Sequence, residues 1–366
     1  MNFDRFQKLY QIAHYEEIKI IGKDIDIDGK TLHLIAMTKQ HHGQMYLYTL
    51  EEAAPIAELG RDYSKKTNRE SMVSSANREG FLNIAKIKVG SCEIEMQGAS
   101  SGVIMQGDYE DTFLFLVKMA EQGWKISEQS YFYEMDWKQV ALTVHDIVTK
   151  EKVQQLSEMK SKGLAVHDMI TPPENLPDFD KETEIEITLA KTCKNQLLQI
   201  PVKLDIGTAQ QITFIDDNEK QVICYISEVK LEDVLKEAKE HFTDNAYREK
   251  MLQYCTEHEF EKHRDSILKT VQEDCPEGMC YISITYECTS EVSLQFYAKE
   301  YLDTIPEPKN HCSSLVFLRH SEQGEGPHGL KNRFCMIQHA VPQDTRYIDA
   351  ELFMAIQTIP ERTIRV

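Results

Sequence analysis

Residues 16–38 read EEIKIIGKDIDIDGKTLHLIAMT, and this stretch decides the predicted fold. From Glu16 to Ile27, apolar residues alternate with charged ones, which is the pattern of a strand with one face toward solvent. Asp28-Gly29 is a strong turn signal, and a second apolar run follows from Thr31 to Thr38. The stretch therefore predicts an antiparallel β-hairpin near the start of the chain.

The other predicted strands come in runs and do not alternate with helices. They cover residues 44–50, 81–89, 92–97 and 103–106, and later residues 184–191, 197–204, 211–215, 221–227, 279–287, 292–297 and 334–341. Helices are predicted over residues 2–14, 51–60, 109–122, 136–162, 231–242 and 348–357. A further, longer helix is predicted to begin after a cap at residue 243 or 244 and to end before residue 276. Residues 61–79 are predicted to form a mobile loop. This clustering of strands predicts the α+β class, in two domains, each a mainly antiparallel sheet packed with a few helices.

A group of prolines marks the predicted domain boundary. The segment 171–183 contains three prolines among acidic residues, and prolines at this density exclude regular structure. We therefore predict an N-terminal α+β domain over residues 1–170, a Pro-rich acidic linker over 171–183 and a C-terminal α+β domain over 184–366.

The composition is that of a soluble globular protein with an acidic surface. Of the 366 residues, 41% are hydrophobic and 28% are charged, so disorder over most of the length is not expected. The net charge of −19 arises from 41 basic and 60 acidic side chains, and it repels polyanions. We therefore expect neither nucleic acid nor a membrane as a partner.

Cysteine usage and the first residues predict a cytoplasmic location. The nine cysteines are an odd number and are scattered along the chain. Residues 1–10 show no apolar core of a signal peptide, and no apolar run is long enough to span a bilayer. The thiols are therefore expected to be reduced, several of them packed as small core hydrophobes.

Two short motifs resemble functional sites but lack the context that their chemistry needs. Asp24–Gly29 begins like a calcium-binding EF-hand loop, but the twelfth position is Ile35 instead of glutamate, and the flanks alternate like strands. Gly98–Gly102 matches the G-x-S-x-G pattern of a nucleophile elbow, but Val103–Gly107 resembles a strand and not the required helix. We interpret the first as a strand entering a turn and the second as a hairpin of small residues.

Two pairs of potential metal ligands also fail on spacing. His258 and His263 are five residues apart, which places them about 140° apart around a helix, too far to bind one ion from a single face. Cys275 and Cys280 have the loose spacing of a zinc knuckle, but only Cys288 lies near as a further thiol. Neither pair predicts a metal site.

Residues 310–341 form the predicted functional stretch. They contain four of the thirteen histidines and two of the nine cysteines, which raises a zinc hypothesis. If residues 334–341 are a strand, Cys335 and His339 lie about 13 Å apart along it. Zinc needs ligand atoms within about 2.0–2.3 Å of the ion, so this spacing argues against a zinc site, and no metal is predicted.

What remains of this stretch is its glycine-rich loop, residues 319–329. Glycine permits backbone turns that expose N–H groups to an anion, and His320 with Glu322 or Glu325 is a predicted acid/base pair. The catalytic candidates are His320, His328, Glu322 and Glu325, and the ligand-binding candidates are Arg319, Gly324 and Gly326. The alternative is a long solvated hairpin loop without chemical function.

Because no motif with an intact context supports catalysis, the sequence favours a non-catalytic binding or regulatory protein. The alternative is a hydrolase or transferase that acts on a small molecule at the 319–329 loop. No cofactor is predicted, and the expected partner is a protein or a small molecule. Whether the protein is an enzyme stays open at this point.

Overall fold

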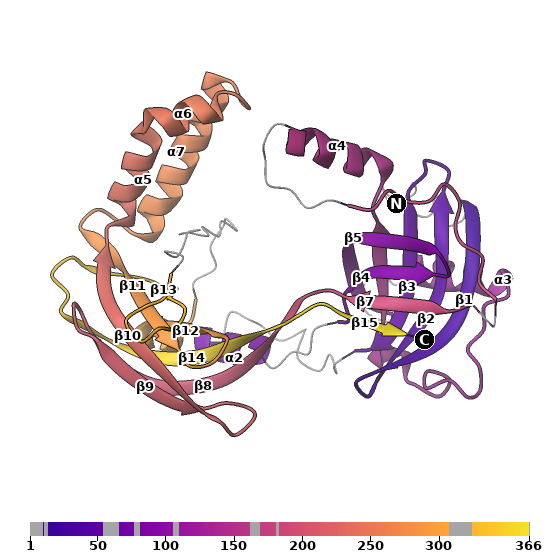
Figure 1. Ribbon diagram of the computed structural model, residues 1–366, viewed down its shortest axis with the longest axis horizontal. Helices are drawn as coiled ribbons and strands as arrows, with labels where there is room; N and C mark the ends of the chain where they lie inside the picture. The colour runs from indigo at the N-terminus through magenta and orange to yellow at the C-terminus, as the bar shows by residue number, and fades with distance from the viewer. Residues whose placement is uncertain are drawn as a thin grey trace. The chain divides into compact units, whose positions relative to one another are not determined.

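The computed structural model describes residues 10, 14–53, 66–76, 81–104, 110–161, 169–180, 183–306 and 324–365 (Figure 1). Within these residues the fold is α+β and rich in antiparallel strands, which confirms the predicted class. No helix in this part of the chain is long and apolar enough to cross a membrane. The helices predicted over 2–14 and 51–60 lie mostly outside the described residues, and residues 51 and 52 end a strand instead.

Contacts divide the chain into two compact units. The first contains residues 1–61, 78–192 and 359–366, and the second contains residues 62–77 and 193–358. The predicted linker, 171–183, therefore falls inside the first unit. Leu176 in this segment is buried in the core of that unit, and its N–H donates to the side chain of Glu17. The proline-rich chain is irregular, but it packs against the sheet of the first unit.

One curled sheet of eight strands forms the framework of the first unit. Its order is β1-β2-β3-β6-β5-β4-β7-β15, and all neighbouring strands are antiparallel. The strands are β1 (Tyr15–Ile27), β2 (Lys30–Gln40), β3 (Met45–Glu52), β4 (Ile84–Val89), β5 (Cys92–Val103), β6 (Val140–Ile147), β7 (Ile185–Leu189) and β15 (Arg362–Arg365).

The predicted hairpin forms between β1 and β2. Its two turn residues, Asp28 and Gly29, have φ angles of 56° and 80°, as two-residue type I′ turns require. Asp24 accepts a hydrogen bond from Nδ1 of His33 at 2.5 Å, and Asp28 pairs with Arg362 of β15. These two acidic side chains of the calcium-like motif are thus bound to protein groups.

Apolar side chains cover both faces of this sheet. One face buries a cluster that includes Leu34, Leu47 and Ile187, and helix α3 (Glu110–Glu121) covers the other face together with Trp124. The apolar spacing of residues 109–122 predicts helix α3, and the helix ends two residues before Gly123, whose φ of 91° suits glycine.

The helix predicted over 136–162 is wrong over most of its first half. The chain forms a short 3-10 turn, η2 (Trp137–Gln139), then β6, and only Lys150–Ser161 are helical, as α4. Because β6 is buried on both faces, its apolar residues do not alternate with polar ones, and their spacing matches a helix by accident.

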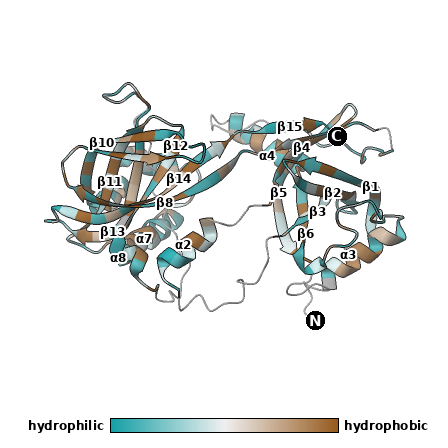
Figure 2. Ribbon diagram, turned by 90° about the horizontal axis from the view of Figure 1, so that it is seen from below, coloured by the Kyte–Doolittle hydropathy of each residue, from teal (hydrophilic) through white to brown (hydrophobic). Residues whose placement is uncertain are grey.

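Two sheets form the core of the second unit. Their orders are β13-β11-β10-β9 and β12-β14-β8. The strands are β8 (Thr192–Asp205), β9 (Gln210–Ile215), β10 (Gln221–Glu232), β11 (Met279–Cys288), β12 (Val292–Ala298), β13 (Arg333–Pro342) and β14 (Tyr347–Ile359). Strands β9 and β10 alternate between buried and more exposed residues. Figure 2 colours the strands of this unit by hydropathy and shows both hydrophobic and hydrophilic residues along β10.

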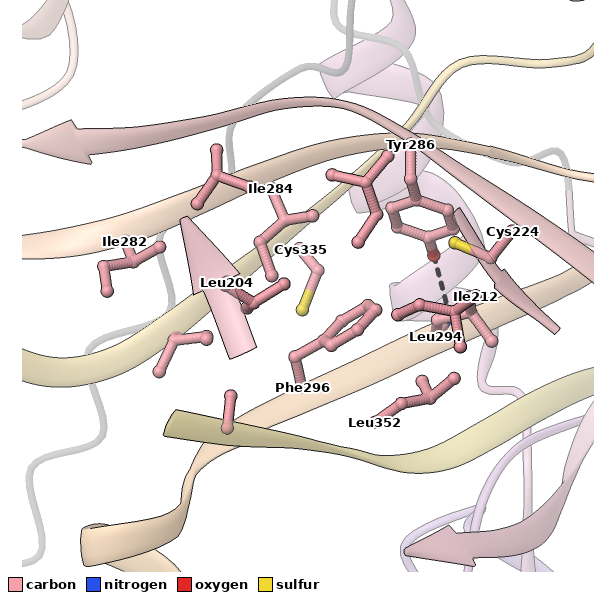
Figure 3. Packing of buried hydrophobic residues seen from close by; sticks show 14 of the residues in the cluster. Leu204, Ile212, Cys224, Ile282, Ile284, Tyr286, Leu294, Phe296, Cys335 and Leu352 are labelled. Carbon is pink, nitrogen blue, oxygen red and sulfur yellow. Dashed lines mark hydrogen bonds between the residues drawn. The ribbon is translucent and has the colours of Figure 1, made fainter. Parts of the chain in front are cut away.

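Side chains from both sheets meet in one apolar cluster (Figure 3). Tyr286 is 1% exposed and its hydroxyl accepts a hydrogen bond from the N–H of Leu294 at 2.7 Å. Cys224 and Cys335 are buried here as free thiols, as expected for cysteines that act as core hydrophobes. The helix predicted over 348–357 is wrong: this segment belongs to β14, whose central residues are buried on both faces.

A helical insertion separates β10 from β11 in sequence, although these two strands pair directly. It comprises α5 (Val234–Thr243), α6 (Asn245–Met251) and α7 (Glu257–Asp274), which extend from the end of the sheet (Figure 1). Asp244 caps α6, as predicted, but the expected single long helix is interrupted, and Thr256 caps α7 with a capping box.

Helix α2 (Asn68–Ala76) forms within residues 61–79, which were predicted to be a mobile loop, and it belongs to the second unit. Its Arg69 donates to both carboxylate oxygens of Glu351 at 2.6 Å and to Asp303 at 2.9 and 3.0 Å. Glu351 is only 5% exposed. Because α2 has no buried residue, no apolar period was visible in its sequence, and polar contacts hold it in place.

Replacing Arg69 with Met is expected to destabilise the second unit by about 2–3 kcal/mol, since it leaves a buried carboxylate without its partner. The value lies below that of fully buried pairs because the Arg69 side chain is 24% exposed. Hydrogen exchange of the α2 amides measures the effect directly. Lys269→Met, which removes an exposed ion pair on α7, is the control; equal α2 protection in both variants would contradict the prediction.

Candidate functional site

The structure describes only part of the predicted site. Three of the candidates, Arg319, His320 and Glu322, lie outside the described residues. The others are Gly324, Glu325, Gly326 and His328, and they belong to a tight hairpin that leads into β13. The predicted chemistry at Glu325 and His328 therefore depends on the geometry of this hairpin.

A β-turn at Gly326–Gly329 closes the hairpin. The Gly329 N–H donates to the carbonyl of Gly326 at 3.0 Å, and the Gly326 N–H donates to the carbonyl of Leu330 at 2.8 Å. Pro327 presets the backbone at the second turn position, and Gly329 adopts a φ of 72°, which glycine tolerates without strain. Much of the glycine and proline content of the loop is explained by this turn.

The turn encloses a buried carboxylate, that of Glu287 on β11. Its side chain has no exposed surface. It accepts hydrogen bonds from the N–H of Leu330 at 3.0 Å, the N–H of His328 at 3.1 Å and Nδ1 of His328 at 2.9 Å. Burial alone would raise the pKa of Glu287, but these donors outweigh it and the pKa is lowered.

The loop therefore presents N–H groups to an anion, and the anion that they bind is the protein's own side chain. Gly326 lies directly against it, because a Cβ at this position would stand 2.3 Å from Cδ of Glu287. Gly324 is different, since a Cβ there would meet no atom within 4 Å. Of the two glycines predicted to bind a ligand, only Gly326 must be glycine for lack of space, and the group that lies against it is the side chain of Glu287.

The imidazole of His328 is held from two sides. Its Nδ1 faces Glu287, and its ring stacks on Tyr225 with centroids 3.9 Å apart and planes 11° from parallel. The side chain is 47% exposed. A carboxylate that orients an imidazole through Nδ1 is the arrangement found in general-base dyads, so this pair is chemically capable of proton transfer.

Glu325 contributes no partner to this dyad: it is exposed and pairs through its backbone with Lys331 in an isolated bridge. In the described residues no three His, Cys, Asp or Glu side chains gather in a way that could hold a metal ion. The residue that sequence reasoning missed is Glu287. It is the only charged residue of β11, which is a local signal, but it precedes His328 by 41 residues, and nothing in the sequence connects it to the loop.

A second buried polar group lies in the first unit. Glu51 accepts hydrogen bonds from the Thr143 hydroxyl at 3.0 Å and from the N–H of Leu82 at 2.9 Å, and burial raises its pKa. The hydroxyl of Ser101 lies 2.7 Å from that of Thr143. The G-x-S-x-G pattern is therefore part of β5 and not the predicted hairpin, and it has neither the turn nor the helix of a nucleophile elbow.

His145 on β6 is buried completely beside this group. Its Nε2 lies 3.3 Å from the Thr49 hydroxyl, and its Nδ1 has no hydrogen-bond partner among the described atoms. Burial lowers the pKa of His145 to about 4, so the side chain is neutral at pH 7.

The chain matches no family model, no curated protein and no solved structure. The functional interpretation consequently rests on the residues themselves.

Gly326→Ala is expected to destabilise the second unit by about 1–3 kcal/mol, because the added methyl group overlaps the Glu287 carboxyl group. Gly324→Ala is the matched control in the same loop and should change stability by less than about 0.5 kcal/mol. Hydrogen exchange of the β11 and β13 amides compares the two variants. Indistinguishable protection in both would show that the loop does not hold Glu287 in this way.

Acid should weaken the first unit partly through His145. In the unfolded chain His145 is protonated below its ordinary pKa of 6.5, whereas in the folded chain it stays neutral down to its lowered pKa of about 4. Stability that is present above pH 6.5 is therefore lost toward pH 4, by about 3 kcal/mol. The stability advantage of wild type over His145→Gln should shrink by this amount from pH 7 to pH 4.

Urea denaturation followed by tryptophan fluorescence tests this expectation, because both tryptophans, Trp124 and Trp137, lie in the first unit. His42→Gln, at an exposed position of the same unit, provides the control. A constant difference between wild type and His145→Gln across this pH range would refute the assignment to His145.

Proposed function

We propose that the protein is a cytoplasmic, non-catalytic binding or regulatory protein. The observation that supports this proposal most directly is that the described part of the glycine-rich loop binds a side chain of the protein itself. The N–H groups of His328 and Leu330, which would otherwise be free to hold an anionic substrate, bind the carboxylate of Glu287. The described part of the loop thereby stabilises the second unit, and this favours recognition of a partner over catalysis at the loop.

The thiols and the net charge support the same proposal. The eight cysteines in the described part of the chain are all free, which fits a reducing compartment. A net charge of −19 disfavours nucleic acid and anionic membrane surfaces. The partner that we propose is therefore a protein or a small molecule.

A second candidate function is a hydrolase or transferase that acts on a small molecule at the 319–329 loop. The Glu287–His328 dyad favours it, because a buried carboxylate fixes the orientation of a half-exposed imidazole. In such a reaction His328 would act as the general base through Nε2, and Glu287 would be its positioning residue.

Turnover assays with His328→Ala separate the two functions. A panel of ester, phosphoester, amide and glycoside substrates is offered to the wild type and to His328→Ala. His258→Ala, which removes an exposed histidine from α7, is the control. For a non-catalytic protein we expect background turnover from all three proteins. Turnover by wild type and His258→Ala that falls about 100-fold in His328→Ala would replace the binding proposal with the enzymatic one.

A further inference from the structure

Strand β5 changes partners along its length. Residues 92–95 pair with β4, whereas Met96–Val103 pair with β6. Among the strands that the structure describes, none pairs with the other side of residues 98–103. Residues 98–102 are all exposed. Within the described part of the chain, the sheet of the first unit therefore has an open edge at residues 98–103, in addition to its two outer strands.

The direction of the open backbone groups follows from one hydrogen bond. The N–H of Ile104 donates to the carbonyl of Val140, next to the paired residues Val103 and Ala141. Since N–H and C=O groups point to alternate sides along a strand, those of Gly102 and the even-numbered residues before it face β6. The backbone groups of the odd-numbered residues, 99, 101 and 103, face the open edge.

The side chains along this edge are small. The sequence from Gly98 to Gly102 is Gly-Ala-Ser-Ser-Gly. Exposed edges are usually protected by lysine, proline or a covering element, because their unpaired groups are a template for another strand. Residues 98–103 contain neither lysine nor proline, and all of them except the partly exposed Val103 are exposed to solvent. The edge has the properties of a site for β-strand addition.

One face of this edge favours a basic side chain. Asp146 of β6 lies directly across from Gly98, and Asp146 makes no ion pair with any described residue. Because Gly98 has no side chain, a lysine from an added strand can pass over it toward the carboxylate of Asp146. The net charge of −19 also favours a basic peptide, and it opposes edge-to-edge pairing between two copies of this chain.

The opposite face favours a small hydroxyl side chain. Thr143 donates its hydroxyl hydrogen to Glu51, so the hydrogen bond between Ser101 and Thr143 must use the hydrogen of Ser101. The oxygen of Ser101 consequently remains an acceptor at the exposed end of this chain of hydrogen bonds. A threonine or serine hydroxyl from an added strand is a suitable donor.

We infer that the 98–103 edge of β5 binds an extended peptide in which basic residues alternate with small hydroxyl residues. The peptide adds a strand to the sheet through the backbone groups of residues 99, 101 and 103. This inference rests on the proposed binding function and names its partner class, but a different measurement tests it.

Fluorescence anisotropy with the full chain and a labelled peptide, Thr-Lys-Thr-Lys-Thr-Lys-Thr, provides the test. We expect saturable binding that weakens about tenfold or more in Ser101→Pro, because proline removes an outward N–H and leaves the pairing with β6 intact. Ser101→Ala keeps that N–H and should bind within about threefold of wild type. Asp146→Asn should bind the lysine peptide more weakly, and a peptide with glutamate in place of lysine should not bind.

Two N-methylated peptides give a test that does not depend on the folding of a variant. Methylation of the lysine amides blocks one edge of the added strand, and methylation of the threonine amides blocks the other. Strand addition requires one of these peptides to bind and the other to fail.

Three results would overturn the inference: no saturable binding by wild type, equal binding by Ser101→Pro and Ser101→Ala, or equal binding of the two methylated peptides. A dimer of the chain that Ser101→Pro dissolves would assign the edge to a second copy and overturn it as well. None of these results changes the His328 assay, so the proposal of a non-catalytic protein stands or falls separately.

Discussion

Burial of charged carboxylates is the constraint on which much of this fold depends. A carboxylate removed from water is unfavourable by several kcal/mol unless protein donors replace the lost water. Glu287 receives its donors from residues 41 and 43 positions later in the chain. To bring two backbone N–H groups and an imidazole around one carboxyl group, the chain must turn sharply and Gly326 must touch it. The glycine-rich sequence follows from that requirement.

A similar arrangement recurs at three other buried glutamates in the described sheets. Glu51 accepts the N–H of Leu82, Glu95 accepts the N–H of Ile170, and Glu351 pairs with Arg69. Each of these carboxylates lies on a strand, whereas Leu82 and Ile170 belong to irregular segments and Arg69 to the polar helix α2. Helix α2 buries no residue of its own, so its polar contacts determine where it lies, whereas the segments around Leu82 and Ile170 also pack apolar side chains against the core of the first unit. A buried acceptor also penalises any arrangement that leaves it unpaired, which makes the anchoring specific.

Local signals account for what the sequence could predict. The hairpin at Asp28-Gly29 and the end of α3 before Gly123 depend on residues close together in sequence, and both were predicted. The sequences of strands β6 and β14 predict helices, because burial on both faces removes the alternation that identifies a strand. The candidate site likewise contains one part that is visible in the local sequence and one part that is not. Its turn residues are recognisable, whereas its central carboxylate lies on another strand, and only the folded chain brings the two together.

The position of His328 is more restricted than the burial of Glu287 requires. The two backbone N–H groups of His328 and Leu330 would still satisfy the carboxylate if the imidazole were removed. The imidazole, in contrast, depends on the carboxylate and on the ring of Tyr225 for its orientation. The imidazole ring is half-exposed and is held between two partners, so it has lost conformational entropy on folding. The turn could form without this ordering of the ring. Because the turn does not require the fixed orientation of the His328 ring, that orientation is the reason to assay His328 for catalysis, although the loop that contains His328 already has a structural role.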